Sequence, residues 1–156
     1  MKILLATDGS SYTEAATRSV VSLLRTQDSE VLVLQIVEPV VFSTPPQMSS
    51  GYAPEMAARL QGLIEDARES VYLTTEMLRT AGFKADSRVV EAEIRTGILD
   101  TAKDWKADLI VLGSHGEKGL RKFFLGSVSE SVARHAPCSV LIVRIPALMN
   151  PILDAI

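Results

Sequence analysis

A glycine-rich segment near the carboxyl end of the chain has the residue types and spacing of a phosphate-binding loop. Gly113-Ser114-His115-Gly116 is followed by nine residues and then by Gly126-Ser127-Val128. Glycine has no Cβ, so a ligand's oxygens can come close to main-chain N–H groups. A helix that starts after Gly126 would add unpaired N–H groups and a favourable dipole at Ser127, Val128 and Ser129. The spacing therefore predicts an anion site.

The charge balance favours a small phosphate ligand over nucleic acid. Between residues 113 and 127, Lys118, Arg121 and Lys122 stand against Glu117, which sums to +3 − 1 = +2 in a chain of net charge −3. The local field thus opposes the overall one, and the acidic pI of about 5.4 disfavours a nucleic-acid backbone.

Length and composition are those of one globular domain. We expect a domain over residues 1–145 and a tail over 146–156 in this chain of 156 residues, of which 47% are hydrophobic and 22% charged. The apolar start is too short for a signal peptide or a membrane span, so we expect a soluble cytoplasmic protein. One cysteine and two histidines give no metal-ligand spacing and no internal disulfide.

The hydrophobic pattern alternates strands with helices. Continuous apolar runs and one alternating run predict strands at 2–7, 31–37, 83–90, 109–112 and 140–143. Helices are expected from 11 to about 24, from after Pro54 to before Gly82, around 98–105, and from 127 to about 135. This order predicts an α/β fold in which an open twisted parallel sheet is covered by helices on both faces. If the first and fourth strands adjoin, Asp8 and Gly113 lie at the same edge.

Three local features carry their own predictions. Ser11-Tyr12-Thr13-Glu14 has the pattern of a capping box at the start of the first helix, and Ser127 is expected to cap the last one. Residues 38–53, rich in proline and serine, are expected to form a long loop, either a surface insertion or a lid. The apolar residues of the tail 146–156 are compatible with docking on a neighbouring subunit or with a frayed end.

Several side chains have a structural explanation beside a functional one. Asp8 could form a turn or bind a ligand, and His115 could be solvated or contact phosphate. His135 is expected near a helix C-terminus, where a cation is favoured. Trp105 falls at core spacing on its helix, and Cys138 opens an apolar run where a small buried residue would serve.

From Lys2 to Arg144 the chain resembles the universal stress protein family, specifically its ATP-binding branch. The marker Gly-x2-Gly-x9-Gly-Ser is complete at 113–127. The opening Leu4-Leu5-Ala6-Thr7-Asp8-Gly9-Ser10 and the closing segment 132–143 are also similar to that family. In place of the Gly-x-Pro that the family often has before the third helix, this chain has Ala92-Glu93-Ile94, so that rim of the site is expected to differ in shape.

The resemblance implies strand order 3-2-1-4-5, a homodimer formed through the last strand at 139–144, and an ATP or AMP site with Mg²⁺ or Mn²⁺. It implies that Asp8 binds the ribose or assists the metal ion, and that the main chain of Ile36 meets the adenine edge. The nucleotide-binding residues it implies are Ala6, Thr7, Asp8, Ile36, Leu112, Gly113, His115, Gly116, Gly126, Ser127, Val128 and Ser129.

Three functions are compatible with these residues. The first is a nucleotide-responsive regulator of the stress response that acts as a homodimer; its protein partner is not predicted. The second is a slow ATPase or an autophosphorylating enzyme, and the third is a dimeric interaction protein without nucleotide. The chain lacks Gly-x4-Gly-Lys-Ser/Thr, and Asp8 is the one acidic residue placed near the phosphates, so binding is expected rather than rapid turnover.

Overall fold

The chain folds around one parallel sheet of five strands. The computed structural model describes residues 1–39, 49–115 and 125–145, and of residues 49–53 it describes the backbone only. The strands are β1 (Lys2–Thr7), β2 (Glu30–Val37), β3 (Lys84–Glu91), β4 (Leu109–Gly113) and β5 (Ser139–Val143). Their order is β3-β2-β1-β4-β5, and every neighbouring pair is parallel. The predicted fold class and strand order are confirmed.

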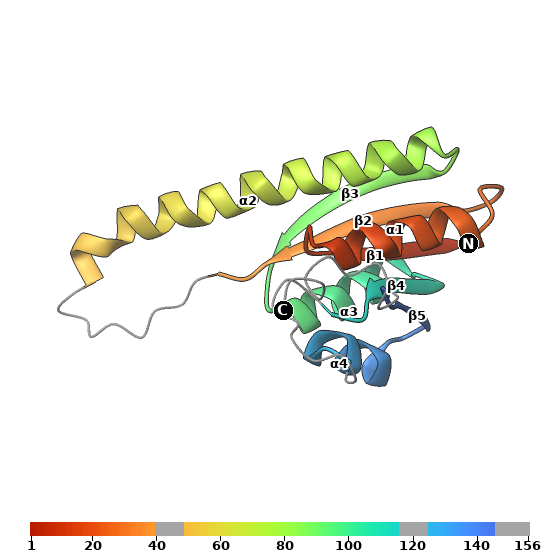
Figure 1. Cartoon of the computed structure of the whole chain (residues 1–156). Helices are drawn as coiled ribbons and strands as arrows, with labels where there is room; N and C mark the ends of the chain where they lie inside the picture. The colour runs from red at the N-terminus through yellow and green to blue at the C-terminus, as the bar shows by residue number, and fades with distance from the viewer. Residues whose placement is uncertain (40–48, 116–124, 146–156) are drawn as a thin grey trace, which may run out of the picture.

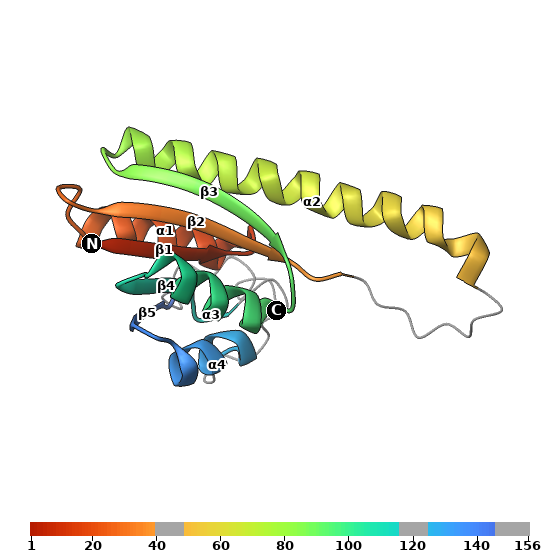
Figure 2. The same cartoon turned by 180° about the vertical axis from the view of Figure 1, so that it is seen from behind.

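Four helices cover the two faces of the sheet (Figures 1 and 2). They are α1 (Ser11–Leu23), α2 (Ser49–Thr80), α3 (Ile94–Trp105) and α4 (Ser127–His135). Side chains of α1 and α2 share a buried cluster on one face, and side chains of α3 and α4 share a second cluster on the other. Within the described residues, no helix is long and apolar enough to cross a membrane.

The central strand β1 is buried on both sides because its side chains alternate between the two clusters. Ile3 and Leu5 pack with α1 and α2, whereas Leu4 packs with α3 and α4. All three are fully buried. This explains why the continuous apolar run is correctly predicted as a strand in a covered parallel sheet. The edge strand β3 alternates exposed residues with buried or half-buried ones from Lys84 to Val89, so it is the more exposed strand that its pattern predicted.

The start of α2 differs from the prediction. The helix begins at Ser49 and contains Pro54, so residues 49–53 belong to it and not to a loop. Proline has a helical φ, and its missing N–H costs one backbone bond near the start of the helix, so the helix continues through it. Residues 40–48, the rest of the expected loop, and the tail 146–156 lie outside the described residues.

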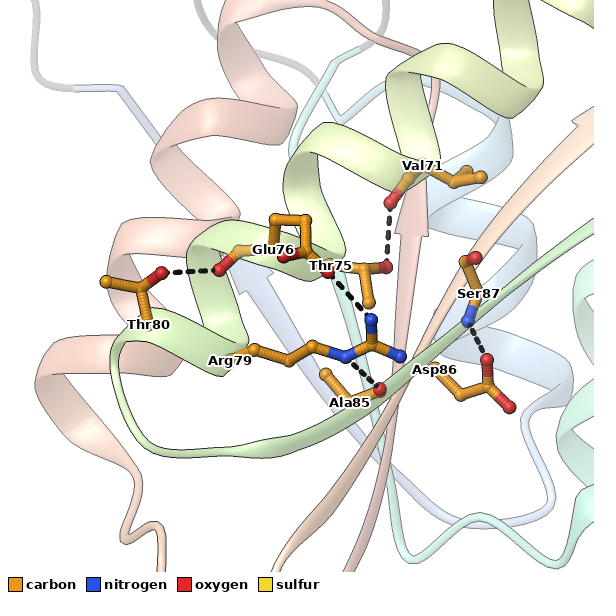
Figure 3. Close-up of polar contacts among 8 residues, drawn as sticks. All are labelled: Val71, Thr75, Glu76, Arg79, Thr80, Ala85, Asp86 and Ser87. Carbon is orange, nitrogen blue, oxygen red and sulfur yellow. Dashed lines mark hydrogen bonds and ion pairs between the residues drawn. The ribbon is translucent and has the colours of Figure 1, made fainter.

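The carboxyl-terminal end of α2 is held against β3, as Figure 3 shows. The Arg79 Nε donates to the Ala85 carbonyl (3.0 Å) and its guanidinium also contacts Glu76 (2.7 Å). Gly82 follows the helix with φ of +94°, the left-handed conformation that ends helices, and Phe83 N–H donates to the Leu78 carbonyl (3.0 Å). These contacts hold the carboxyl-terminal end of α2 to β3.

Candidate functional site

The predicted site residues of β1 and β4 meet at the carboxyl edge of the sheet. β1 and β4 are adjacent, and Asp8 directly follows β1 while Gly113 ends β4. The expectation that the two lie at one edge is therefore confirmed. Ala6 and Leu112 are buried beneath this edge, in the cluster shared with α3 and α4.

Asp8 organises the turn between β1 and α1. Its Oδ1 accepts hydrogen bonds from the Ser10 N–H (3.0 Å) and from the Thr13 hydroxyl (3.0 Å), and Thr13 Oγ1 accepts from the Asp8 N–H (3.1 Å). Gly9, with φ of +77°, allows the tight turn, and its N–H donates to Thr7 Oγ1 (3.1 Å). The structural explanation for Asp8, an Asx turn, is confirmed.

The predicted capping box at the start of α1 is wrong. The N-cap is Ser10 rather than Ser11, and the Ser10 side chain makes no capping hydrogen bond. Glu14, which the box would direct back to the N-cap, pairs instead with Arg18 one turn later. Hydrogen bonds of the Asp8 and Thr13 side chains hold the turn before α1 in place of a capping box.

Gly113 stands where there is no room for a side chain. A Cβ at this position would lie 2.6 Å from the Cβ of Tyr12 and 3.1 Å from the His115 carbonyl oxygen. The next residue, Ser114, is 2% exposed, and its N–H donates to the Val143 carbonyl (2.7 Å) while its own carbonyl accepts from Gly126 N–H (2.8 Å). The end of β4 is thus held between α1, β5 and the start of α4.

Among the described residues, no side chain caps the first turn of α4. Gly126 is the N-cap, and Ser127 is the first helical residue, so the prediction that Ser127 caps the helix is wrong. A glycine N-cap has no side-chain oxygen to accept from the N–H groups of Ser127, Val128 and Ser129, which have no partner within the helix itself. The Ser129 hydroxyl is used elsewhere, because it donates to the Gly113 carbonyl (2.8 Å) and ties the helix to β4.

Tyr12 belongs to this site and was missed by the sequence analysis. Its ring lies 5.4 Å from the His115 ring, at 46° to it. The His115 Nδ1 also lies 3.1 Å from the Ser114 hydroxyl, so the imidazole is oriented from two sides. The one signal in the sequence was that Tyr12 falls in the first turn after the Asp8 loop. Gly116 lies outside the described residues.

The start of α3 lies at the same edge of the sheet, and carboxylates accept hydrogen bonds from its first N–H groups. Glu93 accepts from the Thr96 N–H (2.8 Å) and hydroxyl (2.7 Å), and Glu38 accepts from the Ile94 N–H (3.3 Å). The hydrogen bond from the Thr96 N–H, with help from the Arg95 guanidinium, lowers the pKa of Glu93 to about 2. The departure from Gly-x-Pro noted in the sequence therefore places an acidic cap here.

Ile36 lies against α3 near the end of β2. A Cβ at Gly97 would come within 2.8 Å of the Ile36 Cδ1, so the helix approaches β2 closely at this point. The Val37 carbonyl accepts from the Ala92 N–H (3.2 Å) on the β3 side. Successive peptide groups of a parallel strand turn to opposite neighbours, so the Ile36 carbonyl faces the side of β1, whose last residue Thr7 pairs with Gln35.

Other residues weighed in the sequence have structural roles. His135 is the last residue of α4, and its Nδ1 lies 2.8 Å from the Ser131 carbonyl. Trp105 packs on the cluster shared by α3 and α4, with Lys2 Nζ 5.1 Å from its ring centre. Burial raises the pKa of the Cys138 thiol, and the Asp108 carboxylate adds to that shift. Within the part of the chain that the structure describes, no group of three His, Cys, Asp or Glu side chains could hold a metal ion.

The strand order and the glycine turn after β4 define an open-sheet α/β protein, a class that places its ligands at the carboxyl edge where the strand order reverses. The model of the universal stress protein family matches residues 1–144, and the chain belongs to this family. It is 32% identical over 145 residues to the universal stress protein MJ0531 of Methanocaldococcus jannaschii, covering 93% of this chain and 82% of that protein.

Another relative and several solved structures agree with this assignment. Universal stress protein Sll1388 of a Synechocystis species is 33% identical over 149 residues, covering 92% of this chain and 97% of its own. The structure of the hypothetical protein MJ0577 has a TM-score of 0.81 at 27% identity, covering 94% and 96% of the two chains. More distant structures of the same fold include an Arabidopsis thaliana family member with AMP bound (TM-score 0.61, 18% identity, covering 97% and 96%). An Archaeoglobus fulgidus member is a complex with dAMP (TM-score 0.63, 20% identity, covering 92% and 97%).

Proposed function

We propose that this chain binds an adenine nucleotide, ATP in the first place, at the carboxyl edge of β1 and β4. The observation that carries the proposal is the start of α4: a glycine N-cap without a side-chain cap, held beside a turn at Gly113 that has no room for a Cβ. Main-chain N–H groups at such a helix start attract phosphate through hydrogen bonds and the helix dipole. The AMP and dAMP complexes of distant family members support the choice of an adenine nucleotide.

The difference between the two helix starts on this face supports a proposed orientation of the ligand. The phosphates are placed at Ser127, Val128 and Ser129, because Glu93 and Glu38 already supply negative charge at the start of α3. The His115 ring, oriented by Ser114 and Tyr12, is placed beside them. Asp8 is placed at the ribose or near a Mg²⁺ or Mn²⁺ ion carried by the phosphates, since the described residues offer no metal cluster of their own.

The base is placed near the Ile36 carbonyl, which faces beyond the end of β1. A carbonyl oxygen can accept from the 6-amino group of adenine, whereas guanine has an oxygen there and would leave two acceptors facing each other. This arrangement supports a preference for ATP over GTP. Beneath the ligand, Ala6, Thr7 and Leu112 form the buried floor of the site.

The biological unit that we propose is a homodimer formed through residues 139–144, which acts as a nucleotide-responsive regulator in the stress response. β5 is the last strand of the sheet order, so one of its sides has no strand neighbour among the described residues. The Val143 carbonyl accepts from Ser114 on the β4 side, so the peptide groups of Ile142 face the open side. Val140 and Ile142 are only partly buried in the single chain.

Calorimetry tests the nucleotide proposal most directly. Titration of the full chain with ATP, AMP, cyclic AMP and GTP, each with and without Mg²⁺, should give heat for ATP and much weaker binding of GTP. Mass spectrometry of gently purified protein should detect adenine nucleotide carried through purification. If no adenine nucleotide at millimolar concentration gives heat or raises the melting temperature, the proposal is wrong and the family fold alone remains.

A further inference from the structure

The helix α2 is longer than the sheet that it covers, and its amino-terminal part extends past the ends of β2 and β3 (Figures 1 and 2). From Ala67 onward one side of the helix is buried, with Ala67, Val71 and Leu78 between 0% and 3% exposed. In residues 54–66, by contrast, no side chain is buried. We call residues 54–66 the α2 arm.

The arm continues the apolar side of the helix although it has no sheet beneath it. Its apolar side chains lie three or four residues apart along one side of the helix, at Met56, Leu60, Leu63 and Ile64. This apolar line leads directly to the buried Ala67. Leu63 is 41% exposed. An apolar side of this kind is typical of a helix that packs against another helix, because burial of the apolar side stabilises the helix.

The charged residues beside this apolar line are placed so that they could pair with those of a second arm that runs in the opposite direction. Arg59 and Asp66 are seven residues apart, nearly two helical turns, so both lie on the same border of the line, next to Leu63. A second arm turned end to end by a two-fold axis would set Leu60 against Leu63 of the second copy. The same rotation sets Arg59 near Asp66 of the second copy, and Asp66 near Arg59.

We propose that the α2 arms of two copies of this chain pair antiparallel around a two-fold axis between Leu60 and Leu63. The contact is isologous, so each arm supplies both the apolar residues and both charges. A different kind of partner would not require the arm to contain its own charge complement. Because the arm is remote from the β5 edge, this contact adds to a dimer through β5 and joins two such dimers. The pairing goes beyond nucleotide binding and does not depend on it.

Light scattering coupled to size exclusion, from about 5 to 500 µM of the full chain, tests this arrangement. Leu60→Glu puts a charge in the paired line, and Ile142→Pro removes a main-chain donor from the open side of β5. With both contacts present, the wild type should have the mass of at least four chains, because each β5 dimer carries two arms. Each single variant should have the mass of two chains, and the double variant that of one. Circular dichroism checks that every variant is folded.

These masses separate the two interfaces. If Leu60→Glu lowers the mass of its parent by a factor of two or more, in the wild type or in the Ile142→Pro background, the arm pairing holds, even where the β5 dimer fails. If Leu60→Glu leaves the mass unchanged in both backgrounds, the arm pairing is wrong, whatever Ile142→Pro does. The matched control is Ala58→Glu, which adds the same charge on the exposed side of the arm away from the apolar line and should leave the mass unchanged.

A charge exchange tests the antiparallel direction. Arg59→Glu and Asp66→Arg should each reduce the assembled fraction at a fixed concentration by severalfold, because each sets like charges together across the axis. The double variant Arg59→Glu/Asp66→Arg should restore assembly. If the double variant assembles no better than the single ones, the proposed pairing is overturned. ATP titration of the same variants should be unchanged, so a failed arm contact and a failed nucleotide site give different results.

Discussion

The helices α3 and α4 lie on the same face of the sheet and both begin at its carboxyl edge, but their first turns are completed in different ways. At α3, Glu93 and Glu38 occupy the Thr96 and Ile94 N–H groups. At α4, the N-cap is Gly126, and no side chain in the described part of the chain caps the turn. The contrast indicates which helix start is satisfied by the chain itself and which is suited to an external anion.

Gly113→Ala should have the largest effect, because it disrupts the approach of β4 to α1 beside the open helix start. The new methyl would lie 2.6 Å from the Tyr12 Cβ, and overpacking of this kind costs about 2 kcal/mol. If that cost falls on the bound conformation, ATP affinity drops roughly 30-fold. Calorimetry and urea unfolding measure the two effects. Gly62→Ala is the control, since a Cβ there meets nothing within 4 Å and leaves affinity unchanged.

Gly126→Asp should make the start of α4 resemble that of α3. An aspartate N-cap stabilises a helix by about 1 kcal/mol over residues that cannot cap, and its charge competes with phosphate for the same N–H groups. ATP affinity should therefore fall about tenfold below that of Gly126→Ala. The alanine variant accounts for the Cβ, which would lie 3.2 Å from the Ser114 carbonyl. Equal affinities for the two variants would contradict the role given to the open helix start.

Ser129→Ala removes the hydrogen bond that ties α4 to the end of β4. The lost bond to the Gly113 carbonyl, 2.8 Å long, contributes about 1 kcal/mol, and the helix start should shift relative to the glycine turn. We expect ATP affinity to fall about fivefold. Ser19→Ala serves as the control, because that hydroxyl donates to the Ala15 carbonyl within α1 (3.0 Å). The ATP affinity of Ser19→Ala should match that of the wild type. A similar loss of affinity in both variants would contradict the role given to the Ser129 hydrogen bond.

The fold could be predicted from the sequence because each strand is a short apolar run between clear breaks. Leu109 to Leu112 and Val140 to Val143 are examples, and both are strands in the structure. The start of α2 could not be predicted in the same way. The apolar spacing predicted a helix that starts after Pro54, because the proline- and serine-rich residues before it interrupt that spacing, but the backbone is already helical from Ser49.

The site was predicted in part for a similar physical reason. Glycine spacing identifies Gly113 and Gly126 because their role depends on the absence of a side chain. The contact of Gly113 with Tyr12 joins residues about one hundred positions apart, and only the way α1 crosses β4 brings them together. Helix capping was also misjudged at Ser11 and Ser127, because Asp8 and Thr13 complete one corner and Gly126 leaves the other without a cap.

The smallest effect is expected from removing the charge that closes α3. The pKa of Glu93 is lowered to about 2, so its ionised cap stabilises the fold fully above about pH 4.5 and loses this contribution as the pH falls toward 2. Glu93→Gln should be less stable than the wild type at pH 7, and the difference should shrink through that window and vanish near pH 2.

Urea unfolding between pH 2 and pH 7 measures this difference. Glu69→Gln, which removes the same charge from an exposed position in the middle of α2, should show no comparable loss at neutral pH. ATP affinity should change little in Glu93→Gln, because the phosphates are assigned to α4. A large loss of affinity would mean that the start of α3 also holds the ligand, and a difference in stability that persists unchanged at pH 2 would mean that the cap does not depend on its charge.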